Sequence, residues 1–405
     1  MAKPTRLGAP RVGIVGTGFI ARGVAFEVSR AQDLTLGPVL TRRPPREVEG
    51  LGGAKLVRSS ADLVDGSDIV LECSGDIVHA TPILEHVLDT GMPVVTMDSE
   101  LHVTTGTWLA RRGFLTEAEG DQPGCLVRLH HEALERGFEP LVYINLKGFL
   151  DTNPERATME YWAERQSFRL EQAVSFTDGS KVEIEKALVA NALEASVPPP
   201  ELAGRRIDSI ADSDYLVELA RERGGPVTDF VLAENAPPGV VVLAEHPQAR
   251  TIPHYRPLSR LLTTGESAYQ LLRPHHLCHL EVLHTIREVL AGAPPLLNNT
   301  QSPVYGAYAI AKRDLAPGEL VAGLGGFEVR AETVPLFEAD AKDLAPICLT
   351  AGGRVTGHVA KGEFLRCKEL ELEPSRALEV WRELRLERER AVARARPDAR
   401  RKSSS

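Results

Sequence analysis

The sequence lacks an apolar run long enough to cross a membrane, which takes about 18 residues. The first apolar run, residues 12–15, is also too short for the core of a signal peptide. The five cysteines are scattered along the chain and form no Cys-x-x-Cys pair. These absences lead us to expect a reduced, cytoplasmic protein with no membrane partner.

The chain also lacks an excess of positive charge. Its net charge is −9 at pH 7, which argues against nucleic acid as a partner, because phosphate binding needs a basic surface. Hydrophobic residues make up 43% and charged residues 25% of the chain, as in ordinary soluble proteins. With 405 residues it is too long for one compact core, so we expect roughly two or three domains.

Short apolar strands alternate with helices in the first part of the chain, which predicts an α/β fold with a doubly wound parallel sheet of the Rossmann type. Near residue 303 the pattern changes to short strands between Gly and Pro turns, which predicts a small β-rich domain. The expected strands cover residues 11–15, 34–41, 68–73, 93–97 and 139–146, and the expected helices 20–30, 61–65, 79–89, 123–137, 181–196 and 374–395. The predicted division is a leader over 1–10, a Rossmann domain over 11–150, an α+β catalytic domain over 151–302, the β-rich domain over 303–372, and a charged helix with a disordered tail over 373–405.

A glycine-rich turn follows the first expected strand and opens the first expected helix. Its residues match G-x-G-x-x-A, with Gly16 for the tight turn, Gly18 for close approach of a pyrophosphate, and Ala21 for close helix packing. The backbone around Phe19 and Ile20 would present the positive end of the helix dipole to the anion. The pattern predicts a nicotinamide dinucleotide site; the alternative is a glycine turn in an unrelated α/β protein.

The end of the second expected strand bears on the choice between NAD and NADP. An NAD site usually has an acidic residue there for the ribose 2′-hydroxyl, but this strand ends with Arg42 and Arg43. Two guanidinium groups can bind a 2′-phosphate, so we predict NADP(H); otherwise both are exposed loop cations. Ser74 and Gly75 follow another expected strand. The carboxyl ends of strands line the ligand crevice of an open sheet, so we predict that both residues contact the cofactor. The alternative is that they only form a turn.

Beyond the glycine turn, the sequence resembles the DXR-like oxidoreductases, which are relatives of homoserine dehydrogenase with a C-terminal SAF domain. The resemblance rests on residues 94–100 (VVTMDSE), 120–124 (GDQPG), 147–148 (KG), 178–181 (DGSK) with Glu185 and Asn191, 273–277 (RPHHL) with Glu281, and 311–319 (AKRDLAPGE). It implies an NADPH-dependent activity in isoprenoid biosynthesis, the conversion of 1-deoxy-D-xylulose 5-phosphate to 2-C-methyl-D-erythritol 4-phosphate. It also implies an SAF-like fold for the β-rich domain.

Hydride transfer to a carbonyl needs a cation or an acid near the developing alkoxide. Lys147 and Lys181, each beside a glycine-containing turn, are our candidates for polarising the carbonyl. Asp178 is close enough in sequence to orient Lys181 or shift its pKa, and it could also cap the helix that follows. The alternative for each lysine is a solvated surface charge.

The resemblance implies further site residues. Arg273 would grip a phosphate or carboxylate of the substrate, and His276 would help in proton transfer. Glu100 and Asn191 would contact the substrate.

Metal binding is weakly indicated. His275 and His279 would share a face of the helix expected to begin here, as metal ligands do, but no second ligand pair supports them, so we predict no transition-metal site. The family's reductoisomerase chemistry implies Mg²⁺ or Mn²⁺, for which Asp121, Asp178 and Glu281 could supply oxygen ligands. The sequence itself does not require a divalent metal.

Two functional hypotheses result. The first is an NADPH-dependent reductase or reductoisomerase that acts on a small anionic carbonyl compound. The second is a cofactor-binding regulatory or scaffold protein of the same fold that has lost catalysis. In either case a homo-oligomer is expected, because extra domains beside a Rossmann unit often pair.

Overall fold

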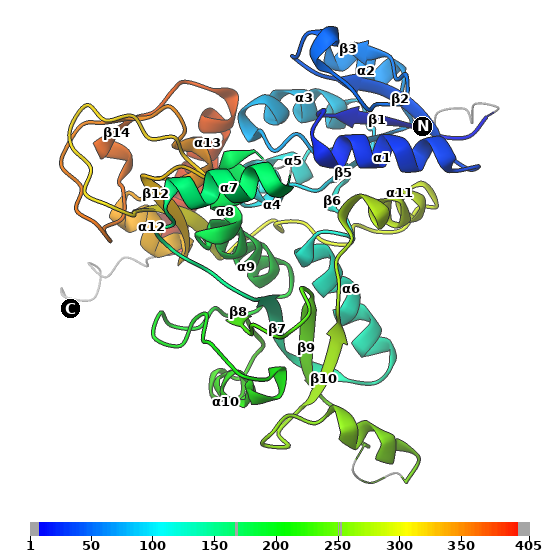
Figure 1. Ribbon diagram of the computed structural model, residues 1–405, viewed down its shortest axis with the longest axis vertical. Coiled ribbons are helices and arrows are strands. Elements are labelled where there is room, and N and C mark those ends of the chain that lie inside the picture. The colour runs from blue at the N-terminus through cyan, green and yellow to red at the C-terminus, as the bar shows by residue number, and fades with distance from the viewer. Residues whose placement is uncertain (1–7, 167–168, 250, 252, 396–405) are drawn as a thin grey trace, which may run out of the picture.

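The computed structural model describes residues 8–166, 169–249, 251 and 253–395. Figure 1 shows a first sheet near the N-terminus, a second sheet below it, and smaller strands beside them toward the C-terminus. The predicted leader lies largely outside the described residues, as does the predicted tail beyond residue 395.

The first sheet has the order β3-β2-β1-β4-β5-β6, and all neighbouring strands run parallel. Its strands are β1 (Arg11–Val15), β2 (Thr35–Leu40), β3 (Leu56–Val57), β4 (Ile69–Glu72), β5 (Val94–Thr96) and β6 (Leu115–Glu117). Buried residues pack α1 (Phe19–Arg30) and α11 (Val282–Leu290) on one face, and α3 (Ile77–Asp89) on the other. The predicted doubly wound Rossmann sheet is confirmed; α2 (Ser60–Asp65) connects β3 to β4.

The second sheet has the order β10-β9-β7-β8 and mixes parallel and antiparallel pairs. Its strands are β7 (Glu139–Lys147), β8 (Val227–Leu232), β9 (Val240–Glu245) and β10 (Tyr269–Arg273). One face is covered by α6 (Gln122–Glu135) and α9 (Ser180–Ala192), and the other by α10 (Asp214–Arg223). We placed residues 139–146 in the Rossmann domain, but β7 pairs with β8 and β9, so this strand belongs to the second sheet.

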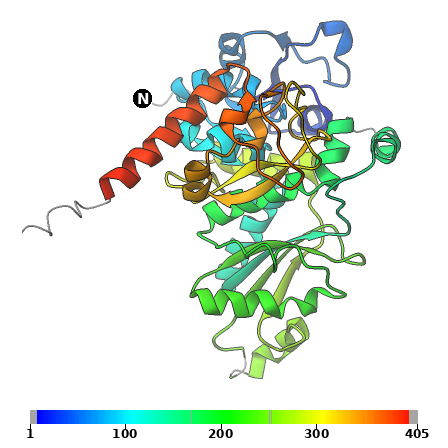
Figure 2. The same ribbon diagram turned by 90° about the vertical axis from the view of Figure 1, so that its left-hand side faces the viewer.

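The C-terminal unit is rich in short strands, as predicted. It contains β11 (Tyr305–Ala311) with β12 (Val329–Pro335), β13 (Arg354–Val355) with β14 (Leu370–Glu371), and the short helix α12 (Leu336–Lys342). Its core includes Ile184 of α9, so the unit packs on the second domain. Helix α13 (Arg376–Ala395) packs on α3 through Trp381 and then extends away from the body (Figure 2).

Two shorter helices lie in the chain between β7 and α9. They are α7 (Arg156–Gln166) and α8 (Leu170–Thr177), which lead directly into α9. Within the described residues, no helix is both long and apolar enough to cross a membrane.

Candidate active site

The turn between β1 and α1 leaves space for a phosphate group. Gly16 has a φ of +119°, and a Cβ atom there would lie 2.9 Å from Cα of Ser74. A Cβ atom on Gly18 would meet no heavy atom within 4 Å, so the space before this backbone is open. No side chain caps α1, whose first turn holds Phe19 and Ile20. An anion can therefore approach a helix N-terminus here, as the sequence predicted.

The predicted arginine pair lies at the end of β2, where a third arginine joins it. Arg42 forms an ion pair with Asp76, which also caps α3. Arg58 donates hydrogen bonds to the backbone oxygens of Arg42 at 2.7 Å and Arg43 at 3.1 Å. The sequence interpretation missed Arg58, although it directly follows β3, and β3 runs parallel to β2.

Two lysines from the second domain converge with acidic residues from the ends of the first sheet. Lys181 Nζ lies 2.9 Å from Oε2 of Glu100 and 3.8 Å from Oδ2 of Asp121. Lys147, the last residue of β7, has its Nζ 2.8 Å from Oε1 of Gln122. Because Asp121 and Gln122 are adjacent at the start of α6, the two lysines share one centre. We call Lys147 and Lys181, with their partners, the lysine centre.

Glu185 is a member of the lysine centre to which the sequence interpretation gave no role. Its Oε2 accepts a hydrogen bond from Asn145 at 2.8 Å and lies 3.9 Å from Lys147 Nζ. Glu185 lies four residues after Lys181 on α9. This spacing places both side chains on one face of the helix, so the sequence could have predicted that Glu185 joins the site. Burial raises the pKa of Glu185 to about 7, although Lys147 opposes this shift.

Lys181 stays a cation in this setting. Burial alone would lower the pKa of its ammonium group, but the carboxylates of Glu100 and Asp121 hold that pKa well above its usual value. Lys181 in turn lowers the pKa of Glu100 despite burial. The site therefore presents a fixed positive charge at Lys181 and a carboxyl group at Glu185 that titrates near neutral pH.

His276 approaches the lysine centre from the segment after β10. Burial lowers the pKa of its imidazole, with Asp121 and Lys147 among the charges that act on it, and its Nδ1 is buried without a hydrogen-bond partner. The backbone N–H of Cys278 donates to Gly120 at 2.9 Å and holds this segment beside Asp121. We expected a helix to begin after Pro274, but α11 begins at Val282, so the shared face proposed for His275 and His279 does not exist.

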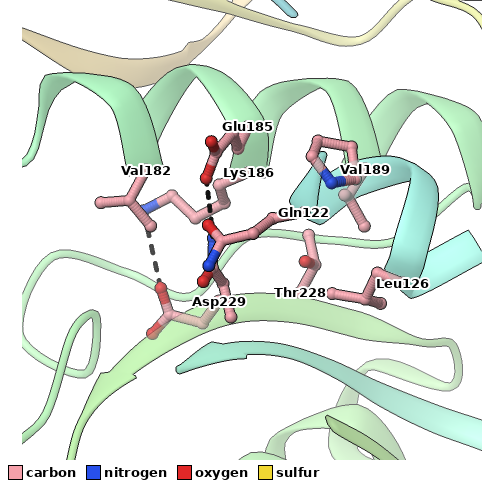
Figure 3. Close-up of a pocket in the computed structure, with 10 residues that line it drawn as sticks. Gln122, Leu126, Val182, Glu185, Lys186, Val189, Thr228 and Asp229 are labelled. Carbon is pink, nitrogen blue, oxygen red and sulfur yellow. Dashed lines mark hydrogen bonds and ion pairs between the residues drawn. The ribbon is translucent and has the colours of Figure 1, made fainter. Parts of the chain in front are cut away.

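An interior pocket adjoins the lysine centre between α9 and the second sheet (Figure 3). Gln122, Asn145 and Glu185 line both regions. Lys186 and Asp229 also line this pocket, and Lys186 Nζ lies 3.6 Å from Asp229 and 2.8 Å from Glu183.

Three predicted site residues have side-chain partners outside the lysine centre. Asp178 does not pair with Lys181; its Oδ2 lies 2.7 Å from Nζ of Lys312, while its Oδ1 caps α9 at the N–H of Ser180. Asp178 thus binds the first backbone N–H of α9 and pairs with Lys312 rather than with Lys181.

Arg273 and Asn191 also have partners of their own. The guanidinium of Arg273 lies between Glu119, at 2.7 Å, and Glu281. The amide of Asn191 binds Asn299 at 2.7 Å and the backbone at Tyr305 at 2.9 Å, which ties α9 to β11. Both side chains are therefore engaged within the protein, and their contact with a substrate stays a prediction.

The residues suggested for a divalent metal do not meet. Asp121 faces Lys181, Asp178 faces Lys312, and Glu281 pairs with Arg273. Across the part of the chain that the structure describes, no group of three or more His, Cys, Asp or Glu side chains is arranged to hold a metal ion.

The sequence of the second domain is similar to a known family. Residues 120–282 match the family model described as "Oxidoreductase DRL, catalytic domain". The matched range includes Lys147, Lys181, Glu185 and His276, and it contains the whole second sheet. The C-terminal unit lies outside the match, so its likeness to an SAF domain stays a prediction.

Other proteins are similar over shorter or more divergent stretches. A meso-diaminopimelate D-dehydrogenase of Lysinibacillus sphaericus is 39% identical over 71 residues, which is 17% of this chain and 22% of that protein. A homoserine dehydrogenase structure from Thiobacillus denitrificans is 16% identical, with a TM-score of 0.46 over 77% of this chain and 84% of that one. An oxidoreductase structure from Agrobacterium radiobacter, in complex with NAD+, L-tartaric acid and magnesium, is 13% identical, with a TM-score of 0.42 over 73% of this chain and 92% of that one.

Proposed function

We propose that this protein is an NADP(H)-dependent oxidoreductase that reduces the carbonyl group of a small anionic compound. The observation that carries the proposal is the lysine centre, where Lys147 and Lys181 of the second domain meet Glu100 and Asp121 from the ends of the dinucleotide sheet. In an open α/β sheet, substrate and cofactor meet at these strand ends. A scaffold protein would not need two partly buried lysines there.

The residues of the centre suit carbonyl reduction. The Lys181 ammonium would stabilise the negative charge that develops on the carbonyl oxygen, and Lys147 would donate a hydrogen bond to the same oxygen. Glu185, next to Lys147, would supply the proton that completes the alcohol. The bound dinucleotide would supply the hydride. We derive no step through a divalent metal, because the suggested ligands are separated.

The cofactor preference rests on the arginines at the ends of β2 and β3. Arg42, Arg43 and Arg58 gather positive charge where a Rossmann fold holds the adenosine ribose, and no acidic residue ends β2. This arrangement favours a 2′-phosphate, and therefore NADP(H), over an unmodified ribose.

The substrate class is proposed from the resemblance to DXR-like enzymes, because the carboxylates of Glu100 and Asp121 already balance the charge of the two lysines. Among known reactions, reduction or reductive isomerisation of 1-deoxy-D-xylulose 5-phosphate is the first candidate, on the resemblance to DXR-like enzymes. Arg273 is already paired with two carboxylates, so we assign it no anion-binding role. Cytoplasmic location and homo-oligomeric assembly stay predictions from the sequence.

The direct test is a turnover screen with purified protein. We expect the near-ultraviolet absorbance of NADPH to fall with at least one phosphorylated or carboxylated carbonyl compound, and NADH to be used less well. NADPH binding without turnover across the panel would favour the catalytically inactive alternative. Equal or better use of NADH would contradict the cofactor assignment.

The pH dependence of turnover tests the role of Glu185. Reduction consumes a proton, so the protonated carboxyl group is the productive form, and its pKa is about 7. We expect kcat to be highest below this pH and to fall roughly tenfold per pH unit above it. Glu185→Gln should lower kcat and abolish this limb of the profile. A limb that persists unchanged in Glu185→Gln would assign the ionisation to another group.

A further inference from the structure

The chain between β7 and β8 reaches the turn after β4, which lies against the dinucleotide turn. Arg169 directly precedes α8, and a Cβ atom on Gly75 would lie 3.8 Å from Nη2 of Arg169. Gly75 follows Ser74, whose Cα lies against Gly16 at the start of the phosphate-binding turn. A cation from the second domain therefore stands at the edge of the predicted pyrophosphate site of the first.

The Arg169 guanidinium is available for a ligand. Among the residues that the structure describes, this side chain forms no ion pair or hydrogen bond. The backbone of Arg169 is bound at the start of α8, where its N–H donates to the side chain of Gln172 at 3.2 Å and its oxygen accepts from the N–H groups of Gln172 and Ala173. The nearest arginines on α7 differ, because Arg156 lies over the ring of Phe327 at 4.3 Å and Arg165 donates to Tyr161 at 2.8 Å.

The acidic groups near Gly75 have partners other than Arg169. Glu72 is fully buried and accepts hydrogen bonds from Ser74 and Thr96. Asp76 pairs with Arg42 and caps α3. An exposed guanidinium without a carboxylate, beside a glycine that leaves room for a ligand, is suited to bind phosphate oxygens through charge-assisted hydrogen bonds.

We propose that Arg169 binds the pyrophosphate of the dinucleotide, so that the cofactor is held by both domains. This inference rests on the proposed function. Arg169 and Lys181 lie at the starts of consecutive helices, α8 and α9, so the same segment carries the cofactor cation and the reactive lysine. The alternative source of the phosphate is the substrate, and the experiment separates the two.

The test compares Arg169→Ala with Arg165→Ala and Arg43→Ala in fluorescence titrations of the full-length protein. The probes are NADPH and adenosine 2′-monophosphate, which carries the 2′-phosphate but no pyrophosphate. We expect Arg169→Ala to weaken NADPH binding about 10-fold or more and to leave adenosine 2′-monophosphate binding unchanged. Arg43→Ala should weaken both probes, and Arg165→Ala neither. Unchanged melting temperatures would show that the exposed substitutions preserve the fold.

Three other outcomes of these titrations would contradict the inference, and each would point to a different role for Arg169. Unchanged NADPH affinity in Arg169→Ala excludes the pyrophosphate contact, and a rise in the substrate KM alone would assign Arg169 to a substrate phosphate. Equal weakening of both probes would place Arg169 at the 2′-phosphate instead. Failure of the unmodified protein to bind NADPH would overturn the proposed function itself, and that failure is visible before any variant is compared.

Discussion

Replacing Lys181 by methionine is expected to lower kcat for carbonyl reduction by about 10²- to 10⁴-fold. Lys181 is the cation of the lysine centre, and Glu100 and Asp121 hold it in the charged state. Methionine keeps much of the side-chain length but removes the charge that would stabilise the developing alkoxide. Steady-state kinetics with NADPH and the substrate found in the screen measure the effect.

The matched control is Lys342→Met. Lys342 is an exposed lysine on α12 that pairs with Glu338 at 3.0 Å, so its loss should leave kcat unchanged. Thermal melting of both variants separates lost chemistry from lost folding, since Lys181→Met leaves two carboxylates without their partner. A folded Lys181→Met variant with full turnover would refute the catalytic role.

Replacing Lys312 by methionine is expected to lower the free energy of unfolding by about 3–5 kcal/mol. The side chain of Lys312 is 1% exposed, and that of Asp178 is fully buried, so the substitution leaves a buried carboxylate without its cation. Lys312 Nζ also donates to the backbone oxygen of Gly326 at 2.6 Å. Urea denaturation of the purified variant measures the loss.

Two comparison variants make this stability prediction specific. Arg313→Met removes an exposed ion pair with Glu319 and should change the free energy of unfolding far less than Lys312→Met does. Adding Asp178→Asn to Lys312→Met removes the unpaired charge, so the double variant should regain part of the lost stability. A Lys312→Met variant that is as stable as the unmodified protein but has strongly reduced turnover would instead support a catalytic role for Asp178.

The local sequence pattern was sufficient to predict the first sheet and its glycine turn. β1 and α1 are adjacent in sequence, and the glycine turn between them follows from residues 16–21 alone. The alternation of strands and helices predicted the doubly wound sheet, because parallel strands need a crossover helix between them. Two glycine-containing turns also drew attention to Lys147 and Lys181, which the fold brings into one centre.

Other features depend on contacts between residues far apart in the chain. Strand β7 has the length and composition of a Rossmann strand, but only sheet pairing shows that it belongs with β8 and β9. The partner of Asp178 is Lys312, 134 residues later, and not the neighbouring Lys181. Sequence proximity is a poor guide to ion pairs, because a helix start can direct neighbouring side chains to opposite sides.

The sequence by itself determined the cofactor turn, the arginine-rich end of β2 and the presence of the two lysines, since these depend on neighbouring residues. Only the tertiary structure decided which acids surround the lysines, that Glu185 is buried beside Lys147, and that Arg273 is occupied by Glu119 and Glu281. The physical reason is that charge and burial at this site come from the packing of two domains, and no local periodicity records which distant side chains that packing brings together.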